Sequence, residues 1–215
     1  MPMPSPRFYR LAITAIFSTA SAAAGAGGVV IQVSDAAGKP VENAIVYAES
    51  ESGQPIAGAK KPGEISQKGL KFIPLVTVVQ TGSKISFPNN DKVRHHIYSF
   101  SPAHKFDQKL YSGTTAEPQT FEKPGVVVLG CNIHDKMLAY VRVVDTPYYG
   151  KTEANGAATV EAPAGKYILK AWHPDMSGSQ QPLEQPVAVK ADGNISASFK
   201  LTLKAPARDA DSATN

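Results

Sequence analysis

Short β-type segments interrupted by proline and glycine dominate this sequence and restrict what it can fold into. The 215 residues include 17 Pro and 17 Gly, and beyond residue 26 no long run repeats apolar residues at the 3.6-residue period of an amphipathic helix. Turn sequences such as Ala154-Asn155-Gly156 separate the segments, because Asn and Gly readily adopt the backbone angles of tight turns. We therefore expect an all-β protein. The clearest expected strands are 29–34, 44–49, 77–80, 84–87, 95–100, 125–130, 138–144, 167–172, 186–190 and 195–203.

The first 26 residues have the order of features found in a secretory signal peptide. Arg7 and Arg10 precede an apolar stretch at 11–17, and small Ala, Ser and Gly residues follow it. That stretch is much shorter than the ~20 apolar residues of a membrane-spanning helix, and no later segment comes close. We expect a cleaved signal peptide at 1–26, a soluble periplasmic protein and no membrane span. Cleavage would remove two Arg and no acid, so the formal net charge would fall from +4 to +2.

The basic residues do not cluster along the sequence, and the C-terminal residues show no pattern of a folded segment. Lys and Arg are scattered singly or in pairs such as Lys60-Lys61. Such scatter is typical of a solvated surface, so the sequence does not indicate nucleic-acid binding. Residues 205–215 have no hydrophobic pattern, and we expect them to form a disordered tail.

The single cysteine of the chain stands in a loop rich in metal-ligand side chains. Cys131, His134 and Met137 follow one another at three-residue steps, and the pair His95-His96 lies in a strand-like run upstream. Cu(I) favours thiolate and thioether sulfur, and Cu(II) favours imidazole nitrogen, so two His, one Cys and a weak Met ligand suit both states. In the alternative interpretation Cys131 is a small buried hydrophobe and Met137 fills the core. A lone thiol in an oxidising compartment cannot form an internal disulfide, whereas metal binding would protect it.

The segments around these residues follow the order of a known family. Phe121, Pro124-Gly125 and a strand at 126–130 lead into Cys131. Upstream, four runs have the character of an opening set of strands: Ile65-Ser66-Gln67, Phe72-Ile73-Pro74, Val78-Val79 and 82–87, followed by Asn89-Asn90. In this order residues 64–146 resemble the cupredoxin family, which includes plastocyanin and amicyanin. The three-residue step from His134 to Met137 is similar to amicyanin, and a weaker resemblance is to proteins labelled methylamine utilization proteins.

The resemblance implies a Greek-key β-sandwich that holds a type-1, or blue, copper ion. His95 falls at the position of the family's first ligand, and Cys131, His134 and Met137 complete the implied set. The family's function implies an exported one-electron carrier rather than an enzyme, and a redox protein as its transient partner. The electron would pass through the edge of His134, beside apolar Ile133 and Leu138.

Two positions near the expected site differ from the family pattern. His96 stands where plastocyanin has Asn, and Gly130 stands where an aromatic residue often precedes the cysteine. Neighbouring strand residues point to opposite faces, so only one of His95 and His96 can face the Cys131 loop. Register with Asn89-Asn90 favours His95.

The segments on either side of the copper region carry a second resemblance. Residues 32–46 look like the opening hairpin of carboxypeptidase-regulatory-like, or transthyretin-type, β-sandwiches, and the closing half follows the copper loop at 151–169 with strands near Val187 and Phe199. One interpretation is a small sandwich with the copper domain inserted into it. The other is two extra strands plus a separate C-terminal module. The expected division is 27–63 for the N-terminal strands, 64–146 for the cupredoxin domain and 147–204 for the C-terminal half.

Other functions remain open at this stage. The main alternative is a periplasmic copper-binding or carbohydrate-associated interaction module without redox cycling, by analogy with the flanking sandwiches. Copper catalysis would require Met137 to leave a coordination position open, and a cysteine hydrolase would leave Met137 and His95 without a role. Further residues with a possible part are His104 as a base near copper, His173 as strand-end packing beside Trp172, and Asp107, Lys109 and Tyr111 as a docking rim.

Overall fold

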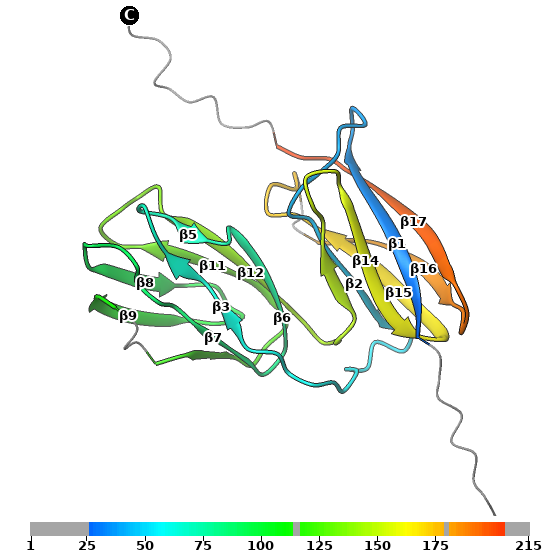
Figure 1. Ribbon diagram of the computed structural model, residues 1–215, viewed down its shortest axis with the longest axis horizontal. Helices are drawn as coiled ribbons and strands as arrows, with labels where there is room; N and C mark the ends of the chain where they lie inside the picture. The colour runs from blue at the N-terminus through cyan, green and yellow to red at the C-terminus, as the bar shows by residue number, and fades with distance from the viewer. Residues whose placement is uncertain (1–25, 114–116, 179–180, 205–215) are drawn as a thin grey trace, which may run out of the picture.

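The structure, a computed structural model, describes residues 26–113, 117–178 and 181–204. Every regular element in these residues is a β-strand, and the all-β class expected from the sequence is confirmed. No helix that could cross a membrane occurs in the described part of the chain. The expected signal peptide lies outside it except for Ala26, which begins the first strand, and so does the expected tail. Figure 1 shows two lobes that are joined by two stretches of chain.

The first lobe is built from the middle of the sequence, coloured cyan to green in Figure 1. Its strands form a five-stranded sheet in the order β6-β12-β11-β8-β9, a three-stranded sheet in the order β10-β7-β3, and the small pair β4-β5. Their bounds are β3 (Gly63–Glu64), β4 (Ser66–Gln67), β5 (Phe72–Ile73), β6 (Val76–Gln80), β7 (Ser83–Ser86), β8 (His95–Ser99), β9 (Phe106–Tyr111), β10 (Gln119–Phe121), β11 (Gly125–Cys131) and β12 (Leu138–Val144).

Buried and exposed side chains alternate along β11, and the buried ones form part of the core of this lobe. Val127, Leu129 and Cys131 are buried and share one hydrophobic cluster with Phe87 and Phe121. Val128 points the other way and is exposed, as the two-residue period of a strand requires. Cys131 is therefore the last residue of a central strand, and the packed core fixes where its sulfur lies.

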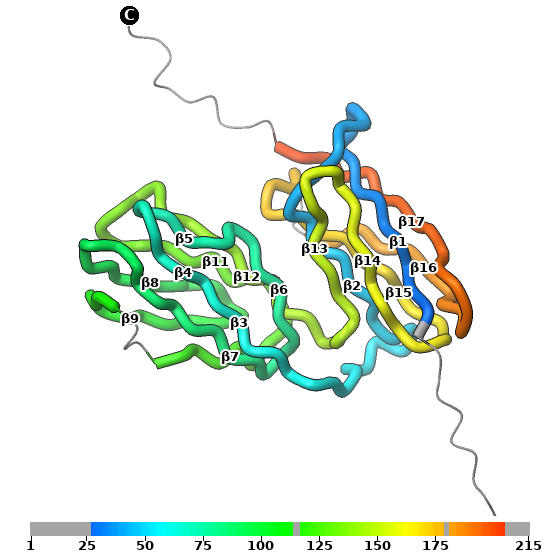
Figure 2. The backbone as a smooth tube through the Cα atoms, in the orientation of Figure 1, coloured from blue at the N-terminus to red at the C-terminus, as the bar shows by residue number. Residues whose placement is uncertain are grey.

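The second lobe combines strands from both flanks of the first. In one sheet β1 lies between β14 and β17, and in the other β2 lies between β13 and β15, with β16 at the edge. Figure 2 shows these early strands in blue among the late strands in yellow to red. The bounds are β1 (Ala26–Asp35), β2 (Ile45–Ser50), β13 (Tyr149–Lys151), β14 (Ala157–Pro163), β15 (Gly165–Trp172), β16 (Leu183–Val189) and β17 (Asn194–Leu201).

An arginine on the outer face of the five-stranded sheet connects the two lobes. Arg142, on β12, donates from a terminal nitrogen to the Tyr47 hydroxyl at 2.5 Å. Its guanidinium carbon lies 5.3 Å from the ring centre of Tyr47 and 5.8 Å from that of Trp172. Val76 and Val144 of the first lobe belong to the hydrophobic cluster of the second. The lobes therefore share a packed interface.

Each of the ten expected strands overlaps an observed one, within a few residues at the ends. The other observed strands include β3, β9, β10, β13 and β14, whereas β4 and β5 coincide with the runs at 65–67 and 72–74 that carry the resemblance. β14 carries three Ala and ends in Pro, and β9 alternates half-buried and exposed residues with two charges. Both segments contain little Val or Ile, the residues that mark a strand most clearly in sequence.

Candidate metal centre

Two consecutive turns explain the three-residue spacing after Cys131. The His134 N–H donates to the Cys131 carbonyl at 3.4 Å, and the Met137 N–H donates to the His134 carbonyl at 2.9 Å. Each bond closes a turn of the i to i+3 type. The chain therefore folds back twice between β11 and β12, and Met137 is again buried, in the same cluster as Cys131.

His95 reaches the cysteine from the neighbouring strand. It is the first residue of β8, and Cys131 pairs with Ile97 two positions further along that strand. The His95 Nδ1 lies 3.8 Å from the Cys131 Sγ, and the His134 Nδ1 lies 3.6 Å from the same sulfur. One donor atom from each of the three residues lies within 4.8 Å of the others. The structure thus brings three of the four expected ligands together and places Met137 in the adjoining core.

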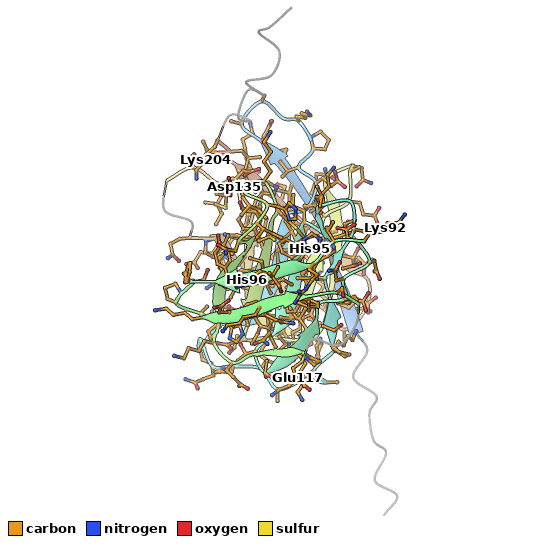
Figure 3. The ribbon with its side chains drawn as sticks, turned by 90° about the vertical axis from the view of Figure 1, so that its left-hand side faces the viewer. Lys92, His95, His96, Glu117, Asp135 and Lys204 are labelled. Carbon is orange, nitrogen blue, oxygen red and sulfur yellow. The ribbon has the colours of Figure 1, made fainter. Side chains whose placement is uncertain are left out.

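His96 lies on the opposite face of β8. Its Nε2 contacts the Oδ1 of Asp107 on β9, while His95 is fully buried on the side of Cys131. Figure 3 looks onto this end of the molecule and labels both histidines. Of the adjacent pair, it is His95 that faces the cysteine.

The donor set suits a single metal ion. Bonds of roughly 2.0–2.3 Å are usual for imidazole nitrogen and thiolate sulfur, so donors separated by 3.6–3.8 Å can reach one point between them. Cys131 and His95 are shielded from water, and His134 is half-buried. One thiolate and two imidazoles, with a thioether in the same core, form the combination that suits copper.

Hydrogen bonds behind the donors hold the segment that leads to His95. The His95 Nε2 bonds to the Asp91 Oδ2 at 2.8 Å. The Asn89 amide donates to the carbonyls of Val93 and Tyr111, both at 2.9 Å, and its oxygen accepts the Asp91 N–H at 3.0 Å. The sequence does not single out Asp91, because its contact with His95 depends on how the segment between β7 and β8 folds.

The two departures from the family pattern have structural counterparts. The Asn132 N–H donates to the His96 carbonyl at 3.1 Å, so a backbone bond ties the ligand segments together. Tyr98 lies opposite Gly130 across the strands, and a Cβ added to Gly130 would come within 2.8 Å of the Tyr98 ring. The Tyr98 ring therefore covers the place where a side chain before the cysteine would lie.

Tyr111 faces inward rather than outward. Its hydroxyl donates to the Phe87 carbonyl and accepts from the Gln67 amide, both at 2.5 Å. Burial raises the pKa of Tyr111 to about 12, against the opposing hydrogen bond from Gln67, so the phenol stays neutral. Of the three residues considered for a docking rim, Asp107 and Lys109 are the exposed ones.

The remaining two histidines lie away from the cluster. His104 follows the far end of β8, and its ring packs against Phe106 and Phe121 with centroids 5.2 and 4.6 Å apart. His173 belongs to the second lobe, where its Nδ1 accepts the Asp175 N–H at 3.1 Å beside fully buried Trp172. Burial lowers the pKa of both imidazoles. Neither structure nor spacing gives His104 a place beside the donors.

Comparison with known proteins identifies distant structural similarities. No family model and no curated protein matches the chain in sequence. Among solved structures, a copper-containing nitrite reductase from Thermus scotoductus SA-01 is 27% identical, covering 45% of this chain and 26% of its own, with a TM-score of 0.37. A purple cupredoxin from Nitrosopumilus maritimus is 22% identical over 38% of this chain and 99% of its own, with a TM-score of 0.34.

A reduced Cu(I) form of an amicyanin variant is 18% identical over 46% of this chain and 98% of its own, with a TM-score of 0.36. The chain spans about a quarter of the nitrite reductase. These structures come from copper proteins, but TM-scores this low do not carry their function over to this chain.

Proposed function

We propose that this protein is an exported type-1 copper protein that carries single electrons and is not an enzyme. The supporting observation is the convergence of His95, Cys131 and His134, whose donor atoms lie within 4.8 Å of one another. Copper bound there would supply a one-electron change between Cu(I) and Cu(II). The known donor chemistry, rather than any distant relative, is the basis for this proposal.

Each side chain has a proposed role. Cys131 would bind copper as the thiolate, together with the Nδ1 atoms of His95 and His134. Met137 would be the fourth, weak ligand. The donors stand on β8, on β11 and on a loop closed by two turns, so their positions need to change little when the charge at the site changes.

Half-buried His134 is the proposed route for electrons. Its neighbours Ile133 and Leu138 are 50% and 44% exposed, and they offer an apolar rim for a partner. Small interfaces are typical of transient redox encounters. The partner is proposed to be another redox protein.

We further propose that residues 64–146 form a cupredoxin domain inserted into a carboxypeptidase-regulatory-like sandwich made by 27–63 and 147–204. The pairing of β1 with β14 and β17 supports a single split sandwich. Residues 1–26 would direct the protein to the periplasm and be removed. N-terminal sequencing of periplasmic material, with a start expected near Ala23, Gly25 or Gly27, tests the export step.

A visible and electron-paramagnetic-resonance spectrum of the copper-loaded protein tests the main proposal. Intense visible absorption is expected from thiolate bound to Cu(II), and Cys131→Ser should abolish it. A colourless protein that holds only Cu(I) would instead support a copper-binding module without redox cycling. A blue colour that survives in Cys131→Ser would refute the assigned site.

A further inference from the structure

A carboxylate outside the donor set makes a short contact with one of the proposed ligands. Asp91 stands four residues before His95, and its Oδ2 lies 2.8 Å from the His95 Nε2. The His95 side chain is fully buried, and that of Asp91 is 13% exposed. Water therefore screens this pair weakly, and the interaction between the two groups is stronger than at the surface.

The same carboxylate is held from its other side by a tight turn. The Gly69 N–H donates to Oδ1 at 2.6 Å, and the Leu70 N–H donates to Oδ2 at 3.1 Å. Both residues have positive φ, 63° and 59°, which is uncommon for a residue as bulky as Leu. Successive N–H groups in such a turn form a concave site for an anion. The turn between β4 and β5 thus fixes Asp91 in place.

The contact with Asp91 determines which ring nitrogen of His95 is free to bind a metal. A carboxylate accepts hydrogen bonds, so the His95 Nε2 carries the hydrogen and donates it to Asp91. The other nitrogen, Nδ1, is left with its lone pair, and this is the atom 3.8 Å from the Cys131 Sγ. Partners of this kind orient a ligating imidazole and make it a stronger donor.

We propose that Asp91 is a positioning residue that sets both the orientation of His95 and the reduction potential of the centre. Its negative charge lies next to a ligand, so it stabilises the more positive, oxidised state and lowers the potential. This inference rests on the proposed function, because it requires copper at the His95–Cys131–His134 cluster.

Asp91→Asn in the full copper-loaded chain is the test. The amide keeps the size of the side chain but removes the charge and points a donor at the ring or the turn. We expect a loss of Cu(II) affinity of about 10–100-fold, the usual range for such partners, measured by competition with a chelator. Cu(I) affinity should fall less, so the potential should rise in voltammetry. Each tenfold difference between the two losses corresponds to about 59 mV for one electron.

The neighbouring histidine supplies a matched control. His96 and Asp107 form the same type of pair on the opposite face of the strand. Asp107→Asn makes the same chemical change and removes the same charge, and we expect Cu(II) affinity and potential to stay at the wild-type values. Asp91→Glu keeps the charge, so its potential should stay closer to the wild type than that of Asp91→Asn.

The outcomes separate this inference from the proposed function. If Asp91→Asn behaves like Asp107→Asn while the wild type is blue, Asp91 has no such role but the copper centre stands. Equal losses of Cu(I) and Cu(II) affinity with an unchanged potential would show that Asp91 only supports the fold. If Asp91→Asn does not fold, Asp91→Ser also removes the charge, and the same rise in potential is expected from it. A Cys131→Ser protein with unchanged copper spectra would overturn the function itself.

Discussion

Two adjacent histidines on one strand provide a sharp test at the scale of single residues. His95 is buried beside Cys131, whereas His96 faces Asp107. His95→Ala should therefore abolish the blue spectrum, because a proposed ligand is lost. His96→Asn should leave the spectrum in place. Visible absorption of the two copper-loaded variants is the measurement, and the reverse pattern would move the ligand to His96.

Met137 offers a second prediction about one side chain. A weak axial thioether is not needed to hold the ion, so Met137→Leu should keep the colour. Cu(II), with its larger charge, loses more from the removal of an electron-pair donor than Cu(I), which keeps the softer thiolate, so the reduction potential should rise. The swap is close to volume-conserving, so it should cost less than ~1.5 kcal/mol of unfolding free energy. Voltammetry and thermal unfolding measure the two quantities.

Met176 is a matched control for that change. It is 5% exposed and lies in the core of the second lobe. Met176→Leu should leave the potential unchanged with a similar small effect on stability. A lower potential, or loss of copper, in Met137→Leu would contradict the axial assignment.

At the scale of elements, the turn before β14 requires glycine for two reasons. Gly156 has a φ of 75°, and an added Cβ would lie 2.4 Å from the Val33 carbonyl oxygen. Gly38 also has a positive φ, 86°, but has open space around it. We expect Gly38→Ala to cost about 1 kcal/mol from backbone strain. Gly156→Ala should cost about 1–3 kcal/mol more, because of the clash. Equal losses of unfolding free energy for the two variants, measured by chemical denaturation, would show that the turn at Gly156 shifts to accommodate the added Cβ.

The strands and the proposed ligands are predicted from different features of the sequence. Strands such as β12, in which buried Ala139, Val141 and Val143 alternate with half-buried Tyr140 and Arg142, follow from local pattern. The step from Cys131 to Met137 could be read because two turns fix it locally. Asp91 and Tyr98 could not be assigned in this way, because their roles depend on which segments lie opposite them. The edge strand β9 was missed since its exposed polar residues resemble a loop.

At the scale of the whole molecule, Arg142 joins the two lobes through Tyr47 and Trp172. Arg142→Ala would leave the buried Tyr47 hydroxyl without this partner. Loss of a hydrogen bond to a charged group costs about 1.5–3 kcal/mol, so the midpoint of thermal unfolding should fall. Arg94→Ala is the control, because exposed Arg94 bonds to the Leu110 carbonyl within the first lobe. An equal fall in the midpoint of thermal unfolding for both variants would argue against a stabilising contact of Arg142 between the lobes.

Acid should destabilise each lobe through its own histidine. Burial lowers the pKa of His104 in the first lobe and of His173 in the second. The unfolded chain therefore binds a proton at each histidine more readily than the folded chain does. The free energy of unfolding that each neutral histidine contributes is fully present above pH ~6.5 and declines as the pH falls through the lowered pKa of the folded state. His104→Gln and His173→Gln should each reduce the loss of unfolding free energy between about pH 7 and 5. Denaturant titrations of the metal-free proteins measure it, and an unchanged pH dependence would contradict the prediction.

The pairing of the first strand with the last ones affects the order in which the chain can assemble. Val29 pairs with Val160 and Ile195, so β1 has no neighbouring strand until β14 has been synthesised, and its second neighbour, β17, follows later still. The strands of the first lobe pair among themselves, so the first lobe can fold before β1 is paired. Once folded, it brings the ends of its own long segment together, which shortens the loop that β1 must close. The copper-site lobe would then act as an internal scaffold for completing the other.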